Sequence, residues 1–285
     1  MTPVNAKSEE GFELQIQSLV INVKSASARM AFQEKQLSMM GIAWKRIPAV
    51  TINDIQITND NVYWDGWQRP LAPAERACLC SHMVCWKMVF NHNTPYLILE
   101  DDALLADDLS EVLIAATQIK DFDLLQLETR NRAKLLGTKV FNFGSAEMRT
   151  LLVDRAGAAG YILWPTGAKK LLNHVAKQPG LADSILAKPG LLRAAQILPA
   201  RVIQNDMAQL FGVAPELPPE ASSVSSACHR RARKSLSQTL RRIMAQLCLG
   251  ILQCQRGQKI MVPFGKKTRI STITTKTSSD DDASL

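Results

Sequence analysis

The sequence predicts an α/β fold in which a mostly parallel, mixed sheet is flanked by helices. Short apolar runs alternate with segments of helical apolar spacing through most of the first 210 residues. This alternation is typical of parallel strands joined by helical crossovers. The hydrophobic share of 46% in 285 residues is enough for a substantial core.

Each element has its own signal in the sequence. Gly41 predicts the end of the first helix, Pro73 predicts the first turn of the second, and Thr166 predicts the start of the last. The expected strands cover 14–23, 42–50, 95–102, 121–128, 159–165 and 197–206. The expected helices cover 26–41, 72–93, 107–120 and 166–177. Residues 52–69 are rich in Asn and Asp and predict a covering loop, in which Trp64 and Trp67 either stack on a ligand or pack on the body.

Charge divides the chain into two parts. Residues 1–227 contain 22 basic and 23 acidic side chains, whereas residues 228–285 contain 12 basic and 3 acidic ones. The basic excess of the chain therefore lies in its C-terminal part. We expect an N-terminal extension (1–14), a body (15–214), a linker (215–228), a basic amphipathic helical region (229–262) and a disordered tail (263–285).

The basic helical region carries one apolar stripe. Its members are Leu236, Leu240, Ile243, Leu247 and Ile251. Basic amphipathic helices bind anionic membrane surfaces, although docking on the body or on a second subunit is the alternative. The N-terminus has no apolar signal region and no apolar run reaches transmembrane length. We therefore expect a cytoplasmic protein, peripheral on the inner face of the cell membrane, with its six cysteines reduced.

Three adjacent acids follow the apolar run 96–99. Glu100 and Asp102 share one face of an extended chain and Asp101 points to the other. Unpaired carboxylates packed together repel one another and are costly to desolvate. A hard divalent cation, Mg²⁺ or Mn²⁺, would remove that conflict, with a solvated acidic turn as the alternative.

Six segments in succession resemble glycosyltransferase family 25, which includes the lipooligosaccharide and lipopolysaccharide biosynthesis transferases and the collagen galactosyltransferase domains. The segments are "LVINV" followed by Arg29, "GIAWKRIPAV", "LAPAERACLCSHMVCWKMV", "YLILEDDALL", "DFDLLQLE" and "GAAGYILWPTGAKKLL". The resemblance covers about residues 16–210. The chain departs from the pattern at 71–74, at 23–24 and at 181–183, where Asp183 is the one acid kept from a pair.

The resemblance implies a GT-A nucleotide-sugar transferase fold over 15–214, a UDP-sugar donor and inversion at the anomeric carbon. By this resemblance, Asp102 and Asp101 would hold the divalent metal. The residues expected to contact the nucleotide sugar are Asn22, Val23, Arg29, Glu100, Asp101 and His82. Asp183 is the first candidate for the base that deprotonates the acceptor hydroxyl, and Glu128 is the second.

Other interpretations stay open. The expected acceptor is a lipid-linked oligosaccharide of the lipooligosaccharide core, receiving galactose or glucose, and no nucleic acid is expected. The alternatives are a protein galactosyltransferase, a sugar-nucleotide-binding protein without turnover, and a nucleic-acid-binding protein that uses the basic region. On helical spacing, Glu75, Cys78, His82 and Cys85 share one face, which would form a zinc site only with a ligand from elsewhere.

Overall fold

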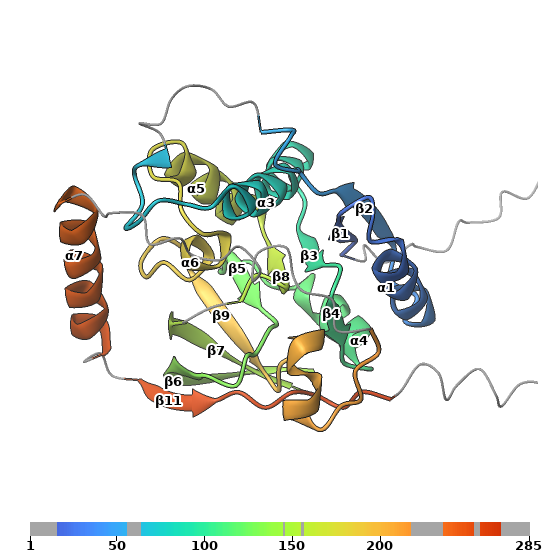
Figure 1. Ribbon diagram of the computed structural model, residues 1–285. Helices are drawn as coiled ribbons and strands as arrows, with labels where there is room; N and C mark the ends of the chain where they lie inside the picture. Colours follow the sequence, from blue (N-terminus) through green and yellow to red (C-terminus); the bar gives the residue numbers. More distant parts are fainter. Residues whose placement is uncertain are drawn as a thin grey trace, which may run out of the picture.

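The computed structural model describes residues 16–55, 64–144, 146–154, 157–217, 236–253 and 257–268. Within them, one sheet has the strand order β11-β6-β7-β9-β5-β8-β3-β1-β2 (Figure 1). Its strands are β1 (Ser18–Asn22), β2 (Trp44–Pro48), β3 (Tyr96–Glu100), β5 (Leu124–Gln126), β6 (Ala133–Phe143), β7 (Ala146–Val153), β8 (Gly160–Leu163), β9 (Ala194–Leu198) and β11 (Gln258–Met261). A second pair joins β4 (Ala103–Leu105) to β10 (Val202–Gln204).

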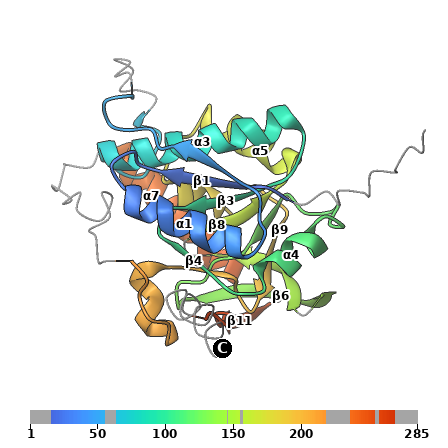
Figure 2. The ribbon, with the colours of Figure 1, turned by 90° about the vertical axis from the view of Figure 1, so that its right-hand side faces the viewer.

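Helices cover both faces of the main sheet (Figure 2). One face packs against α1 (Ser27–Met39) and α4 (Leu109–Ala116). The other packs against α3 (Pro73–His92), α5 (Pro165–Val175) and the short α6 (Ala182–Leu186). The strands β1 and β3 are apolar on both faces because both faces are buried. The remaining helices are the 3₁₀ helix η1 (Asn205–Phe211) and α7 (Leu236–Gln253).

The α/β prediction is confirmed, although less of the sheet is parallel than we expected. Parallel pairing joins β2 to β1, β1 to β3 and β5 to β9, whereas the other neighbours pair antiparallel. Much of the antiparallel part is the β6–β7 hairpin, which we did not predict. Its side chains give no clean alternation of buried and exposed positions, and its register shifts at Leu136.

One of two predicted element ends is confirmed and the other differs slightly. Gly41 has φ +64° directly after Met40, the C-cap of α1, as a C-terminal glycine should. Helix α5 begins at Pro165, one residue before Thr166. The Thr166 hydroxyl instead donates to Asp123 Oδ1 at 2.8 Å.

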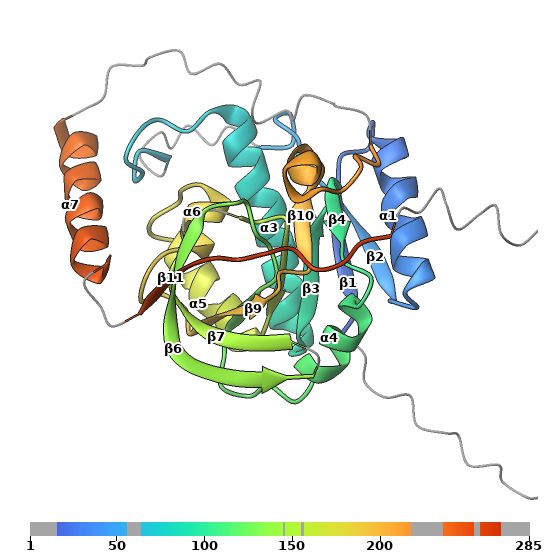
Figure 3. The ribbon, with the colours of Figure 1, turned by 90° about the horizontal axis from the view of Figure 1, so that it is seen from below.

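The expected boundaries at the C-terminal end are wrong for residues 257–268. We predicted helix up to 262 and disorder from 263, but 258–261 form β11 at the edge of the sheet. The following residues cross the molecule toward α1 (Figure 3). There the Ala200 amide donates to the Pro263 carbonyl and Lys267 Nζ donates to Gln36 Oε1. Backbone pairing, which composition does not reveal, therefore attaches this segment to the body. The rest of the predicted tail lies outside the described residues.

Candidate functional site

The three consecutive acids separate as the chain leaves β3. Asp101 turns toward β1 and α1, where Asn22 Nδ2 donates to its Oδ2 at 2.6 Å and Arg29 lies 3.1 Å from its Oδ1. Burial raises the pKa of Asp101, and the charge of Arg29 and the Asn22 hydrogen bond partly offset that effect. Because both carboxylate oxygens already have protein partners, this geometry adds no support to a metal-binding role for Asp101.

The same contacts hold the end of β1 in place. The Asn22 side chain is buried, and its amide also donates to the Ala26 carbonyl. Its Oδ1 atom is buried and has no hydrogen-bond partner among the described residues. A hydrogen-bond acceptor without a donor thus lies beside the acids. Asn22, Val23 and Arg29 are the residues expected from the sequence to contact the nucleotide there.

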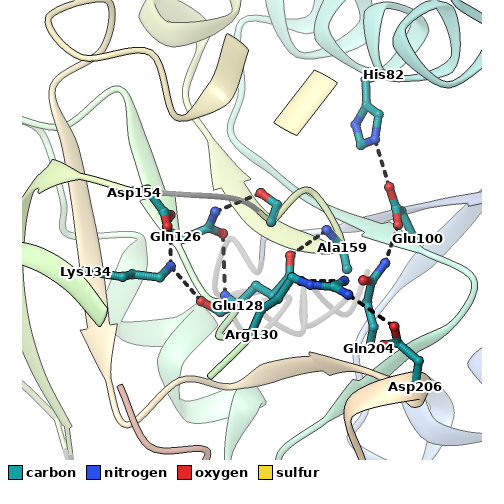
Figure 4. Close-up of polar contacts among 11 residues, drawn as sticks. His82, Glu100, Gln126, Glu128, Arg130, Lys134, Asp154, Ala159, Gln204 and Asp206 are labelled. Atoms are coloured by element: carbon teal, nitrogen blue, oxygen red, sulfur yellow. Dashed lines mark hydrogen bonds and ion pairs between the residues drawn. The ribbon is translucent and has the colours of Figure 1, made fainter. Parts of the chain in front are cut away.

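Glu100, the last residue of β3, is fixed by two side chains that come from different directions (Figure 4). His82 Nε2 lies 3.3 Å from Oε1, and Gln204 Nε2 donates to Oε2 at 2.9 Å. Burial alone would raise the pKa of Glu100, but the hydrogen bonds from His82 and Gln204 outweigh it and the pKa is lowered. Glu100 is therefore an ionised carboxylate in a defined orientation.

His82 is tied in turn to Tyr161. Its Nδ1 lies 2.9 Å from the Tyr161 hydroxyl, to which Trp86 Nε1 donates at 2.8 Å. A carboxylate can only accept and an indole N–H can only donate, so a neutral His82 donates from Nε2 to Glu100 and accepts the Tyr161 proton at Nδ1. Helix α3 and strand β8 together orient the ring.

Asp102 has a buried carboxylate oxygen, Oδ1, that accepts no hydrogen bond from the described residues. Glu128 and Asp108 each have such an oxygen too, but the oxygens of those two acids each have an arginine ion-pair partner. Burial, followed by the negative charges of Glu100 and Asp101, raises the pKa of Asp102 to about 7. A buried carboxylate oxygen beside other acids matches the oxygen ligands that Mg²⁺ and Mn²⁺ prefer. The residues present thus fit a hard divalent cation at Asp102.

Asp183 belongs to the same neighbourhood, although it comes from α6. Its Oδ1 accepts from the Ser184 amide at 2.6 Å. Burial raises its pKa first, and the charges of Glu100 (raising) and His82 (lowering) also act on it. We define the acidic site as Glu100, Asp102 and Asp183 together with His82. The structure thus gathers residues that are separated by up to about 100 positions in the sequence.

Glu128 lies deeper, with no exposed surface. The Ala159 amide donates to its Oε2 at 2.8 Å, and Arg130 is 3.8 Å from its Oε1. Burial and the charge of Glu100 raise its pKa to about 8, so it carries a proton at neutral pH. A Cβ atom on Gly157 would come within 2.6 Å of Oε2, which shows how closely the backbone covers this acid. The geometry favours Asp183 over Glu128 as a base that must meet a substrate.

The tryptophans of the predicted loop pack on the body. Trp64 is 8% exposed and lies under the Arg76 guanidinium, 5.2 Å from its ring centroid. A Cβ atom on Gly180 would lie 2.5 Å from Trp67, so that ring sits against the segment leading into α6. Most of the predicted loop before Trp64, residues 56–63, lies outside the described residues.

Sequence reasoning missed several residues around the site. Gln204 and Arg130 were not singled out, although Gln204 lies in the predicted strand 197–206 and Arg130 comes shortly after the predicted strand 121–128. Arg130 donates to Asp206 of η1 at 3.1 Å, and its charge helps to lower the pKa of Glu100 (Figure 4). Tyr161 lies inside an apolar run and gave no polar signal. Lys134 is buried behind Glu128 and binds Asp154 Oδ2 at 2.9 Å, which only the unpredicted β6–β7 hairpin brings about.

Comparison with known proteins shows which family this chain matches. The model of glycosyltransferase family 25 (LPS biosynthesis protein) matches residues 15–186. The chain is 26% identical over 165 residues to the lipooligosaccharide biosynthesis protein lic2B of Haemophilus influenzae, covering 55% of this chain and 62% of that protein. It is 28% identical over 176 residues to the lacto-N-neotetraose biosynthesis glycosyltransferase LgtE of Neisseria meningitidis serogroup B, covering 58% and 62%.

A third relative, the lipooligosaccharide biosynthesis protein lex-1 of Haemophilus influenzae, is 31% identical over 133 residues, covering 44% of this chain and 43% of that protein. The matched regions span about six-tenths or less of these relatives. The family match extends over more than half of the chain and includes Glu100, Asp102, His82 and Asp183. The chain therefore belongs to glycosyltransferase family 25.

Proposed function

We propose that the protein is an inverting glycosyltransferase that moves a hexose, galactose or glucose, from a UDP-sugar to a lipooligosaccharide or lipopolysaccharide core acceptor. One observation carries the proposal: a buried, unpartnered carboxylate oxygen of Asp102 at the carboxyl end of β3, beside Glu100 and near Asp183. Ligands of α/β sheets bind beyond such strand ends. The names of the relatives support the acceptor class.

The donor would lie across the ends of β1 and β3 in a GT-A fold. Asp102 would hold Mn²⁺ or Mg²⁺, which as a Lewis acid neutralises charge on a diphosphate leaving group. The unpartnered Oδ1 of Asn22 and the Val23 backbone would contact the nucleotide, with Arg29 nearby. Glu100, ionised and held by His82 and Gln204, would accept hydrogen bonds from the ribose or the uracil.

Asp183 would remove the acceptor hydroxyl proton. Burial raises its pKa above the ordinary value for an aspartate, which makes it a stronger base than an exposed one. Single displacement with inversion requires that base on the side of the sugar opposite the leaving diphosphate. Asp183 comes from α6, whereas Asp102 follows β3, so the two acids approach from separate elements.

We propose further that α7 holds the enzyme on the inner face of an anionic membrane, near a lipid-linked acceptor. Its exposed apolar side chains form one stripe: Leu240 (61% exposed), Ile243 (47%), Met244 (54%) and Leu247 (57%). Arg241 and Arg242 are exposed on the same helix. Among the described residues, no helix combines the length and the apolar character needed to cross a bilayer. The exposed apolar stripe and the two arginines are the features that support binding at the membrane surface.

The first experiment is a donor screen. Thermal stabilisation and slow hydrolysis are measured for UDP-glucose, UDP-galactose and other UDP-sugars, with Mn²⁺ and with chelator. The proposal expects a metal-dependent response to one of them, lost in Asp102→Asn and kept in the surface control Asp121→Asn. Stabilisation without hydrolysis or transfer would indicate a sugar-nucleotide-binding protein instead. Binding to RNA or DNA with no response to any UDP-sugar would overturn the proposal.

A further inference from the structure

Three possible ligands of different chemical kinds meet at the acidic site: its members His82 and Glu100, and the neighbouring Cys78. Cys78 and His82 lie one helical turn apart on α3, and Glu100 ends the neighbouring strand β3. The Cys78 thiol, a His82 ring nitrogen and a Glu100 carboxylate oxygen all lie within 4.8 Å of one another. Two ligands four positions apart on a helix and a third from an adjacent element is a common arrangement in zinc proteins.

The distance between two of these atoms already suits a tetrahedral site. His82 Nε2 and Glu100 Oε1 are 3.3 Å apart. With metal–ligand bonds of about 2.0–2.2 Å, the edge between a nitrogen and an oxygen of a zinc tetrahedron is about 3.4 Å. A charge-assisted hydrogen bond is usually shorter, about 2.7–2.9 Å. The pair is thus long for a hydrogen bond but well spaced for two ligands of one cation, and the Cys78 thiol, within 4.8 Å of both residues, is the third candidate ligand.

The surroundings of His82 also suit a metal ligand. Its other nitrogen, Nδ1, lies 2.9 Å from the buried hydroxyl of Tyr161, which Trp86 holds from the opposite side. With a metal on Nε2 the ring proton lies on Nδ1 and is donated to the Tyr161 hydroxyl oxygen, and metal-binding histidines usually have such an acceptor there, because it fixes the orientation of the ring. His82 itself is 1% exposed, so its ring has little freedom to turn away.

The charge around Cys78 favours a cation. Burial, and then the negative charges of Glu100, Asp183 and Glu75, raise the pKa of its thiol well above its usual range. The free thiolate is therefore disfavoured, whereas a bound divalent cation displaces the thiol proton and is attracted by the same acids.

We propose that Cys78, His82 and Glu100 form a binding site for a thiophilic divalent cation of the Zn²⁺ class, separate from the hard-cation ligand Asp102. The fourth position stays open to water. Provided that the proposed function holds, zinc here takes Glu100 away from the donor, so zinc inhibits transfer where Mn²⁺ supports it.

The test uses Co²⁺ as a spectroscopic substitute for Zn²⁺ on the full reduced chain without nucleotide. Thiolate coordination gives a sulfur-to-cobalt charge-transfer band, and added Zn²⁺ should abolish it. The band should disappear in Cys78→Ser. In His82→Gln, the affinity for cobalt, measured from the same band, should fall at least about tenfold. Cys80→Ser, two positions along the same helix, is the matched control and should keep the parent band. Thermal melts confirm that each variant folds.

Asp102→Asn separates this inference from the proposed function. It should keep the cobalt band while it loses metal-dependent UDP binding. Cys78→Ser should lose the cobalt band while it keeps metal-dependent UDP binding. An unchanged band in Cys78→Ser, or no band in the parent at millimolar Co²⁺, would overturn the site even if the enzyme proves to be a transferase. A band that survives while Zn²⁺ leaves transfer unaffected would remove only the inhibitory consequence.

Discussion

Two aspartates next to strand ends, the buried Asp123 and the partly buried Asp102, show how differently the fold treats acids. Asp123 precedes β5 and has no exposed surface, yet Thr166, Lys170 and the Arg193 backbone amide all donate to its carboxylate. Burial acts against its ionisation, but these hydrogen bonds outweigh burial and lower its pKa to about 2. Asp102 follows β3, has a buried oxygen without a partner, and has its pKa raised to about 7.

We infer that the difference separates a structural acid, Asp123, from the proposed metal ligand, Asp102. At Asp123 the protein supplies its own cation and donors, so the carboxylate joins α5 and β9 to the start of β5. At Asp102 the protein supplies further negative charge instead, from Glu100 and Asp101. A fold maintains an unsatisfied buried acid where something outside the chain completes it.

The largest effect should come from Asp102→Asn. Metal-dependent transfer should fall about 10³-fold, because the cation at a leaving diphosphate contributes several kcal/mol. The melting temperature should stay the same or rise, since the change removes a buried unpaired charge. Initial rates with Mn²⁺ and a thermal melt check this together. A transfer rate like the parent's would place the cation elsewhere.

Asp183→Asn should lower transfer by about 10²-fold or more while donor binding is kept, because loss of a general base affects the chemical step. Glu128→Gln is the comparison, and it should change transfer far less because Glu128 is buried and protonated near neutral pH. Steady-state rates and UDP titrations on both variants decide the assignment. Lost UDP affinity in Asp183→Asn would make Asp183 a donor-binding residue, and the reverse order of the two variants would make Glu128 the base.

Asp123→Asn should act on stability and not on chemistry. We expect a loss of about 2 kcal/mol in the free energy of unfolding, because the variant loses hydrogen bonds to a buried charged group while the Lys170 and Arg193 side chains are themselves partly exposed. The folded pKa of about 2 lies below the unfolded value, so the carboxylate stabilises the fold above about pH 4 and this contribution is lost as the pH falls from 4 toward 2. Urea titrations of parent and variant between pH 3 and 7 measure it. Equal stability at pH 7 would contradict the structural role.

The exposed apolar stripe of α7 offers a similar comparison for hydrophobic side chains, because the body does not cover it. Replacing Leu240, Ile243 and Leu247 by Gln should reduce flotation with anionic vesicles at least about tenfold, because each apolar side chain that enters the interface contributes. Arg241 and Arg242 stay in place in this variant, so loss of charge cannot explain the result. Raising the salt should weaken parent binding, since 0.1 M salt screens exposed charges beyond about 10 Å.

Equal flotation of parent and variant, or none by either, would assign the stripe to packing or to a second subunit. Truncation at residue 228 is not a clean alternative. It would also remove β11 and the packed residues that follow, including Val262, whose carbonyl accepts from Thr129.

The sequence was most informative where one face or both faces of an element are buried. The runs ending at Asn22 and Glu100, and the helix from Pro73, lie where their apolar spacing predicts them. The β6–β7 hairpin could not be predicted because its residues carry no strong period, and β11 could not be predicted because it is held by pairing with β6, which is far away in the sequence. The segment after residue 256 has a tail-like composition, yet backbone hydrogen bonds decide its place.

The sequence pattern predicted which residue types gather at the site. It did not predict which hydrogen-bond or ion-pair partners each side chain has. Three adjacent acids look equivalent in the sequence. Only the packing of β1 and α1 shows that Asn22 and Arg29 bind both carboxylate oxygens of Asp101. Gln204 comes from a strand about 100 residues later, so no local signal links it to Glu100. The contact between Cys78 and Glu100 likewise depends on how α3 lies against β3.

The most direct measurement of the central claim is the affinity of the protein for UDP, by calorimetry, with Mn²⁺ and with chelator. The account predicts that Mn²⁺ strengthens binding at least about tenfold at pH 8 and that this gain shrinks as the pH falls below about 7, where protons compete with the cation at Asp102. In Asp102→Asn the gain should vanish at every pH. Tight UDP binding that is unaffected by chelator, or no UDP binding in either condition, would contradict the account.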